Sequence, residues 1–64
     1  MLSKTETKVV WLVGEGMTNA TIAQLLGISK NTVEQHLSNI KHKVDIPNGV
    51  HNRVWLAMHV KELV

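Results

Sequence analysis

The 64-residue sequence contains no cysteine. Neither a disulfide nor a thiolate metal site can therefore stabilise the fold, and nothing indicates an oxidising compartment. We expect no signal peptide, and the sequence has no apolar run long enough to cross a bilayer. We therefore expect a cytoplasmic protein without a membrane partner.

The sequence also has little excess charge of either sign, because it contains seven Lys or Arg residues and five acidic residues. This balance is compatible with nucleic-acid binding, although dedicated basic tails and patches are usually denser. A chain of this length forms a single domain, and a domain this small buries only a small core.

Signals of catalysis and of metal binding are missing. No nucleophile has a neighbouring base, no carboxylates form a pair, and no glycine-rich phosphate loop is present. Four histidines occur without an i, i+4 pair and without a carboxylate at ligand spacing; they are His36, His42, His51 and His59. We expect no enzymatic activity, no cofactor, no metal and no small-molecule ligand.

The most informative stretch is residues 18–44, whose pattern predicts two helices around a glycine turn. Gly27 can adopt the positive φ that ends a helix over 19–26, and Ser29 is placed to cap a second helix over 30–43. A short helix, a turn containing glycine and a second helix of about four turns form a helix-turn-helix. In this motif the second helix lies in the DNA major groove.

The predicted helix over 30–43 has an apolar face and a polar face. The apolar residues recur at i, i+4, i+7 and i+11; they are Val33, Leu37, Ile40 and Val44. On the polar side, amides can pair with adenine, a carboxylate can accept from cytosine, and a serine can bond several base edges. The expected base-contacting residues are Asn31, Glu34, Gln35 and Ser38.

A second set of side chains is expected to contact phosphates, which position a protein on DNA without reading its sequence. These residues are Asn19, Lys30, Thr32, His36, Lys41, His42 and Lys43. Two alternatives stay open. His36 lies near the apolar face, so it is equally well explained as a half-buried side chain that holds the turn. Residues 41–43 are also typical of a solvated helix end, where cations favour the negative pole of the helix dipole.

Helices are also predicted on both sides of this motif. Ser3 and Glu6 form a capping-box pattern that starts a helix over 4–14, with Val9, Leu12 and Val13 on its buried face and Trp11 outside it. The turn at 45–49 ends the helix over 30–43. A last helix over 50–62 follows, with Val50, Val54, Ala57 and the stem of Lys61 on its expected core face. We expect an all-α fold, a small four-helix bundle that contains the helix-turn-helix.

Almost the whole chain resembles the LuxR/GerE/FixJ-type DNA-binding domain of bacterial transcription regulators. The matching residues are Leu2-Ser3, Thr5-Glu6, Val9, Leu12, Gly16, Thr18-Asn19, Ile22-Ala23, Leu26, Ile28-Ser29, Thr32-Val33, His36, Ile40 and Lys43-Val44. Each match is weak alone, but a dozen at the family's spacing is specific. The resemblance implies a sequence-specific regulator that binds double-stranded DNA, either alone or as part of a larger response regulator.

The resemblance also implies a homodimer, because the last helix often forms the dimer contact in this family. Three residues left uncovered on the predicted last helix suit that contact: His51, Trp55 and Met58. Packing of Trp55 and Met58 into the small core is an equally good alternative. Several positions depart from the family, which commonly has lysine at Glu34, a second basic residue near Ser38, arginine at Gly49 and small apolar residues at Asn52-Arg53.

Two other functions are compatible with the same fold. The chain could be a protein-interaction module, such as an anti-activator or a polymerase-binding factor, that uses Glu34 and the apolar last helix to bind a partner. It could also be a relative of sigma-factor region four, which shares the helix-turn-helix and requires RNA polymerase.

Overall fold

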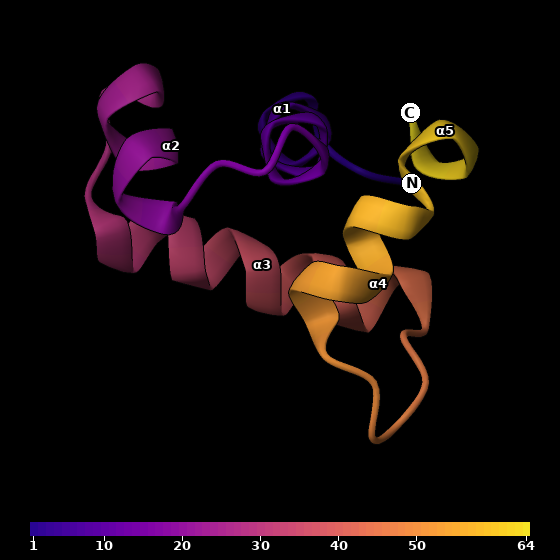
Figure 1. The fold of residues 1–64 in the computed structure, drawn as a ribbon. Helices are drawn as coiled ribbons and strands as arrows, with labels where there is room; N and C mark the ends of the chain where they lie inside the picture. The colour runs from indigo at the N-terminus through magenta and orange to yellow at the C-terminus, as the bar shows by residue number, and fades with distance from the viewer.

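The computed structural model describes all 64 residues and contains only helices, which confirms the all-α prediction. The five helices are α1 (Lys4–Gly14), α2 (Asn19–Leu26), α3 (Lys30–Val44), α4 (Asn52–Met58) and α5 (Val60–Leu63) (Figure 1). The first two have the expected bounds, and α3 extends one residue beyond the expected end. None of the five combines the length and apolar character needed to cross a membrane.

The start of α1 is a complete capping box. The Ser3 hydroxyl accepts a hydrogen bond from the Glu6 N–H (3.1 Å), and Glu6 Oε1 accepts one from the Ser3 N–H (2.7 Å). These two bonds satisfy backbone donors that a helix start otherwise leaves without a partner. The pattern seen in the sequence therefore fixes the first residue of α1.

The two helices of the helix-turn-helix are capped in the same manner. Thr18 accepts from the backbone N–H three residues later (3.2 Å), and Ser29 does so at the start of α3 (3.1 Å). Between them Gly27 ends α2 with φ of 69°, in the left-handed region that glycine occupies without strain. The start of α2, the turn after it and the start of α3 are thus each marked by a local signal.

The expected single helix over 50–62 is wrong, because the chain forms α4 and α5 there. α4 begins only at Asn52 without a side-chain cap, and His59 leaves the helical region with φ of −116° and ψ of 16°. The break redirects α5 onto α1, where Val60 lies against Gly14. A Cβ at Gly14 would come within 2.5 Å of a Val60 methyl group, so this approach requires glycine.

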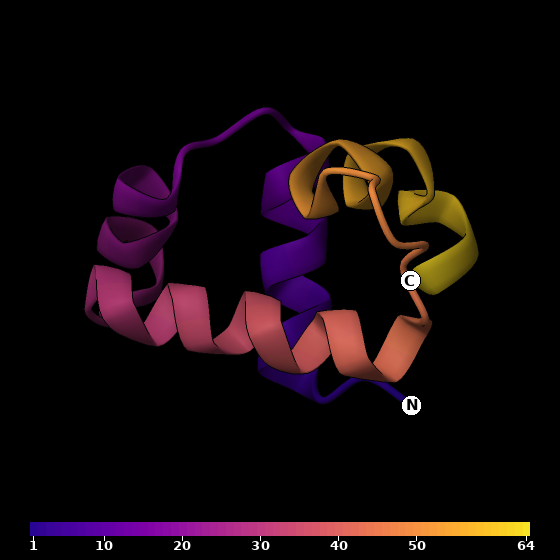
Figure 2. The ribbon, with the colours of Figure 1, turned by 90° about the horizontal axis from the view of Figure 1, so that it is seen from below.

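The helices surround one core. α1 crosses α3 at a steep angle, with α2 packed over the first turns of α3 and α4 on the other side of α1 (Figures 1 and 2). The buried apolar residues are Val9, Val10, Val13, Ile22, Ala23, Val33, Ile40, Ile46 and Leu56. The apolar face of α3 packs as expected, with Leu37 and Val44 half-buried at its edges. Trp11 is exposed, as expected.

The expected core face of the last helix is also wrong. Val50 and Val54 are 41% and 54% exposed and Ala57 is exposed, whereas Leu56 is completely buried. The helical period could not select the face here, because apolar side chains occur on every side of residues 50–62. The structure therefore leaves an apolar stripe of α4 in solvent.

Candidate nucleic-acid interface

The four expected base-contacting residues lie together on the solvent side of α3. Asn31, Glu34, Gln35 and Ser38 are all exposed, and their i, i+3, i+4, i+7 spacing places them on one face. The opposite face of the same helix is fixed in the core through Val33 and Ile40. The core therefore anchors one face of α3. The four exposed residues on the opposite face, called the polar row below, are free to contact another molecule.

The expected phosphate-contacting residues fall into two groups. Lys30, Lys41 and His42 are exposed and make no hydrogen bond within the protein. Thr32 and His36 are half-buried, and the Thr32 hydroxyl lies 2.8 Å from the Ser29 hydroxyl at the helix cap. The free basic side chains are thus at the two ends of α3, on either side of the polar row.

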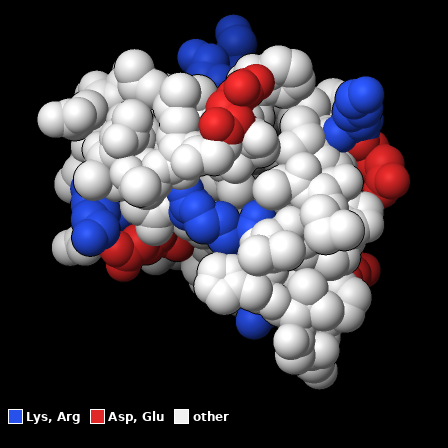
Figure 3. Space-filling model, in the orientation of Figure 1, with Lys and Arg blue, Asp and Glu red and all other residues white.

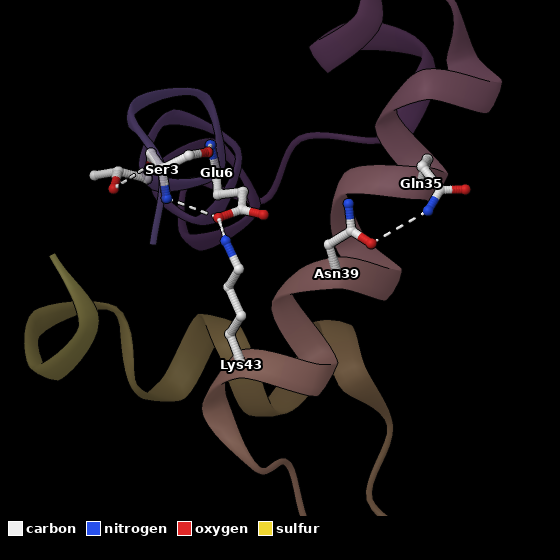
Figure 4. A network of polar contacts seen from close by, with 6 residues as sticks. Ser3, Glu6, Gln35, Asn39 and Lys43 are labelled. Atoms are coloured by element: carbon white, nitrogen blue, oxygen red, sulfur yellow. Dashed lines mark hydrogen bonds and ion pairs between the residues drawn. The ribbon is translucent and has the colours of Figure 1, made fainter. Parts of the chain in front are cut away.

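Lys43 lies apart from these cations because it binds a buried carboxylate. Its Nζ is 2.8 Å from Glu6 Oε1, in the only ion pair of the structure (Figure 4). The Glu6 side chain is only 5% exposed, whereas that of Lys43 is 42% exposed. This contact connects the end of α3 to the start of α1 and so helps to set the orientation of α3.

The pKa of Glu6 lies below its ordinary value of 4.5. The hydrogen bond from Lys43 is the main cause, the bond from the Ser3 backbone N–H adds to it, and burial opposes both. The sequence pattern predicts only a capping role for Glu6. Its spacing from Val9 and Val13 already places it on the buried face of α1, and that signal could have identified it as a buried acid.

Asn19 is held by Arg53, which the sequence pattern does not indicate as a site residue. Arg53 at the start of α4 donates from Nη1 to Asn19 Oδ1 (2.5 Å) and from Nη2 to the Met17 carbonyl oxygen. The guanidinium therefore joins α4 to the start of α2. Because the Asn19 oxygen is occupied, its amide nitrogen remains the group available to a phosphate. No local sequence pattern indicates a contact between residues 34 positions apart.

A further contact lies within the polar row of α3. Gln35 Nε2 donates to Asn39 Oδ1 at 3.2 Å, and both side chains are exposed (Figure 4). Asn39 was not among the expected site residues. Its i, i+4 spacing from Gln35 is the signal that could have identified it, since residues four apart are neighbours on a helix surface.

Charge is distributed thinly over the molecule. The face drawn in Figure 3 is mostly uncharged, with basic and acidic side chains interspersed. This distribution agrees with the net charge of +2. Any anion that binds here is therefore held by a few individual cations and hydrogen-bond donors rather than by an extended basic patch. No group of three potential metal ligands is present.

The expected dimer residues do not form one surface. His51 is exposed and Met58 is 75% exposed, but Trp55 is half-buried against the core. The Trp55 indole stacks on the His59 ring with centroids 4.0 Å apart, and His59 Nδ1 donates to the Trp55 carbonyl oxygen (2.8 Å). The exposed apolar stripe consists of Val54 and Met58, one turn apart on α4, and of Val50, which lies just before the helix.

Comparison with known proteins gives a consistent family. Residues 1–60 match the family described as bacterial regulatory proteins, luxR family. The chain is 41% identical over 51 residues to the transcriptional activator protein CarR of Pectobacterium carotovorum, covering 80% of this chain and 21% of CarR. It is 44% identical over 46 residues to the regulatory protein SdiA of Escherichia coli, covering 72% of this chain and 19% of SdiA.

A third relative is the transcriptional regulatory protein LiaR of Bacillus subtilis, 35% identical over 54 residues, covering 84% of this chain and 26% of LiaR. The chain thus spans about a fifth to a quarter of the length of these three relatives. No solved structure matches it significantly.

Proposed function

The chain belongs to the LuxR-type helix-turn-helix family of bacterial transcription regulators, and we propose that it binds double-stranded DNA with α3 in the major groove. The observation that carries this proposal is the exposed polar row of α3, whose opposite face is anchored in the core. An α-helix fits the major groove, where base edges present distinct donors and acceptors. The domain then acts at the bacterial chromosome, in the cytoplasm.

In this arrangement the polar row reads bases and the ends of α3 contact the backbone. Gln35 and Asn31 pair with adenine, and the Glu34 carboxylate accepts from cytosine N4. Lys30 and Lys41 contact phosphates on either side of the groove. Glu34 also repels phosphates, so it lowers affinity for sequences that offer it no donor and raises selectivity.

Two substitutions separate base reading from backbone contact. Gln35→Ala is expected to cost about 1–3 kcal/mol on the preferred sequence and to relax selectivity at one base pair. Lys41→Ala is expected to weaken binding to all sequences alike and to reduce the slope of log affinity against log salt by about one unit. Fluorescence anisotropy with labelled duplexes at several salt concentrations measures both effects.

Lys61→Ala is the matched control for Lys41→Ala, because Lys61 is exposed on α5, away from α3. It should leave affinity and salt slope close to those of the unmodified chain. Wild-type binding by both the Gln35 and the Lys41 variants would show that α3 does not enter the groove.

We also propose that two copies bind together through α4. The exposed stripe of Val50, Val54 and Met58, with His51 beside it, supplies the apolar surface, and Trp55 supports it from the core side. A single domain of this size contacts only a few base pairs. A dimer on two half-sites about one helical turn apart doubles the contacts and therefore raises affinity.

Val54→Glu is expected to abolish pairing while the monomer stays folded, because the new carboxylate is placed in solvent at the centre of the stripe. Analytical ultracentrifugation with a half-site pair should show one copy bound where the unmodified chain shows two. Leu25→Glu is the matched control, since Leu25 is 59% exposed on α2. Two copies bound by the Val54 variant would exclude this stripe as the contact.

A further inference from the structure

We propose that Arg53 is a positioning residue for DNA binding, which holds the Asn19 amide with its nitrogen presented to a DNA phosphate. The inference rests on the proposed function, because it requires α3 to lie in the major groove. In a helix-turn-helix the first helix, here α2, crosses the DNA backbone. Asn19 is the first residue of α2. Arg53 acts through Asn19 and does not itself need to contact DNA.

Two hydrogen bonds join the Arg53 guanidinium to the chain at the start of α2. Nη1 donates to Asn19 Oδ1 (2.5 Å), and Nη2 donates to the Met17 carbonyl oxygen. All three residues are half-buried. Because a guanidinium is planar and its donors have a fixed geometry, it holds the two oxygens at fixed positions relative to each other. One rigid group on α4 thus fixes both the backbone before α2 and the first side chain of α2.

The orientation of the Asn19 amide follows from the chemistry of its partner. A guanidinium has N–H donors and no acceptor, so only the amide oxygen can bond to it. The amide nitrogen therefore points away from Arg53, and it makes no hydrogen bond within the protein. No buried side-chain nitrogen or oxygen lacks a partner, so this unbonded nitrogen reaches solvent. Asn19 thus presents two N–H donors outward, which is the chemistry that a phosphate oxygen accepts.

A held amide differs from a free one in two respects. A free asparagine amide rotates about a broad, roughly two-fold torsion, so a phosphate must order it on binding at a cost in affinity. Because Arg53 orders the amide during folding, this cost no longer falls on DNA binding. The bond that the amide oxygen accepts from a cation also polarises the amide and strengthens its N–H groups as donors.

The charge of Arg53 supports the same role. The guanidinium bonds two neutral oxygens, and the only ion pair of the structure joins two other residues, Lys43 and Glu6. No acidic side chain therefore neutralises Arg53, and its positive charge attracts an anion bound at Asn19. The contact thus orients the Asn19 donors and makes their surroundings favourable for a phosphate.

The test is a double-mutant cycle of Asn19→Ala, Arg53→Met and both together, with affinity measured by fluorescence anisotropy on two duplexes of unrelated sequence. We expect each single variant to bind about two- to tenfold more weakly, from the lost bond or the lost ordering. The loss should be the same on both duplexes, because phosphate contacts do not read sequence. The double variant should be weaker than either single variant by less than about twofold, since Arg53 acts through Asn19.

Two further variants separate positioning from charge and from folding. Lys61→Met removes one exposed cation on α5 and is the matched control for the charge lost in Arg53→Met; its affinity should stay close to that of the unmodified chain. Arg53→Lys keeps the charge without the planar group, so it should also weaken binding, and only in a chain that has Asn19. Circular dichroism at the assay temperature shows which variants are folded, and Arg53→Lys replaces Arg53→Met in the cycle if the latter unfolds.

Single losses that add fully in the double variant would overturn the proposal, because Arg53 would then act independently of Asn19. Unchanged affinity of Arg53→Lys, or a loss confined to one duplex, would overturn it too. Failure of the proposed function is recognised separately. In that case the unmodified chain would show no salt-dependent binding to either duplex, and Lys41→Ala would change nothing.

Discussion

Replacing Ile40 with alanine is expected to remove much of the free energy of unfolding, at a cost of about 2–5 kcal/mol. Ile40 is completely buried on the core face of α3, and only nine apolar residues form the core. A domain of this length has in total about 3–10 kcal/mol of stability. The loss of one large side chain from so small a core therefore leaves a substantial unfolded fraction. Urea unfolding followed by circular dichroism measures the effect.

Leu37→Ala is the matched control for Ile40→Ala. Leu37 lies one turn earlier on the same face of α3 but is only half-buried, so its truncation leaves a smaller cavity and should cost less. Equal losses for the two variants would contradict the position of Ile40 at the centre of the core.

Lys43→Met is expected to cost about 1–3 kcal/mol at neutral pH, because it leaves the Glu6 carboxylate buried without its cation. Because the Ser3 N–H still donates to Glu6 Oε1, we expect a loss of stability toward the lower end of this range. Glu6→Gln should cost less, because Lys43 is 42% exposed and water can hydrate it once the carboxylate is gone. The diagnostic result is a larger loss of stability in Lys43→Met than in Glu6→Gln.

The stabilising effect of the ion pair should depend on pH with a definite sign. The pKa of Glu6 in the folded chain is below 4.5, its ordinary value in the unfolded chain. As the pH falls through this interval the unfolded chain binds the proton first, so the contribution is complete above about pH 4.5 and is lost below the folded pKa. The stability difference between the unmodified chain and Lys43→Met should shrink accordingly in acid.

Glu6→Gln should remove this part of the acid sensitivity, since glutamine does not titrate. Urea unfolding at a series of pH values from neutral to acid measures all three chains under the same conditions. A Lys43→Met variant with unchanged stability at neutral pH, or with a deficit that grows in acid, would contradict the role of the pair.

The features that the sequence predicts correctly are those encoded by neighbouring residues. Ser3, Thr18 and Ser29 mark three helix starts because each cap acts within three residues. Gly27 marks the turn for the same reason. The apolar face of α3 is also evident, because polar residues surround it and leave a single stripe that can be buried.

The features that the sequence does not predict depend on distant residues or on a choice among equivalent faces. The burial of Leu56 in place of Val54 could not be derived, because α4 is apolar on more than one side. The bond from Arg53 to Asn19 and the pair of Lys43 with Glu6 join segments more than thirty residues apart. Only the tertiary packing of the helices brings those side chains together.

The proposed site shows the same division. The exposure of Gln35 and its three companions follows from the helical period, so the sequence predicts their common face. The bond that holds Gln35 required knowledge of side-chain orientation. The residue type of Trp55 is equally compatible with a dimer contact and with core packing; in the structure Trp55 packs half-buried against the core and stacks on His59.

The most direct test of DNA reading by α3 is an NMR titration of the isotope-labelled chain with a mixed-sequence duplex at low and moderate salt. We expect chemical-shift changes concentrated at residues 30–43 that weaken as salt rises, because phosphate contacts release counterions. No shift changes, or changes confined to residues 50–64, would contradict the proposal that α3 reads DNA.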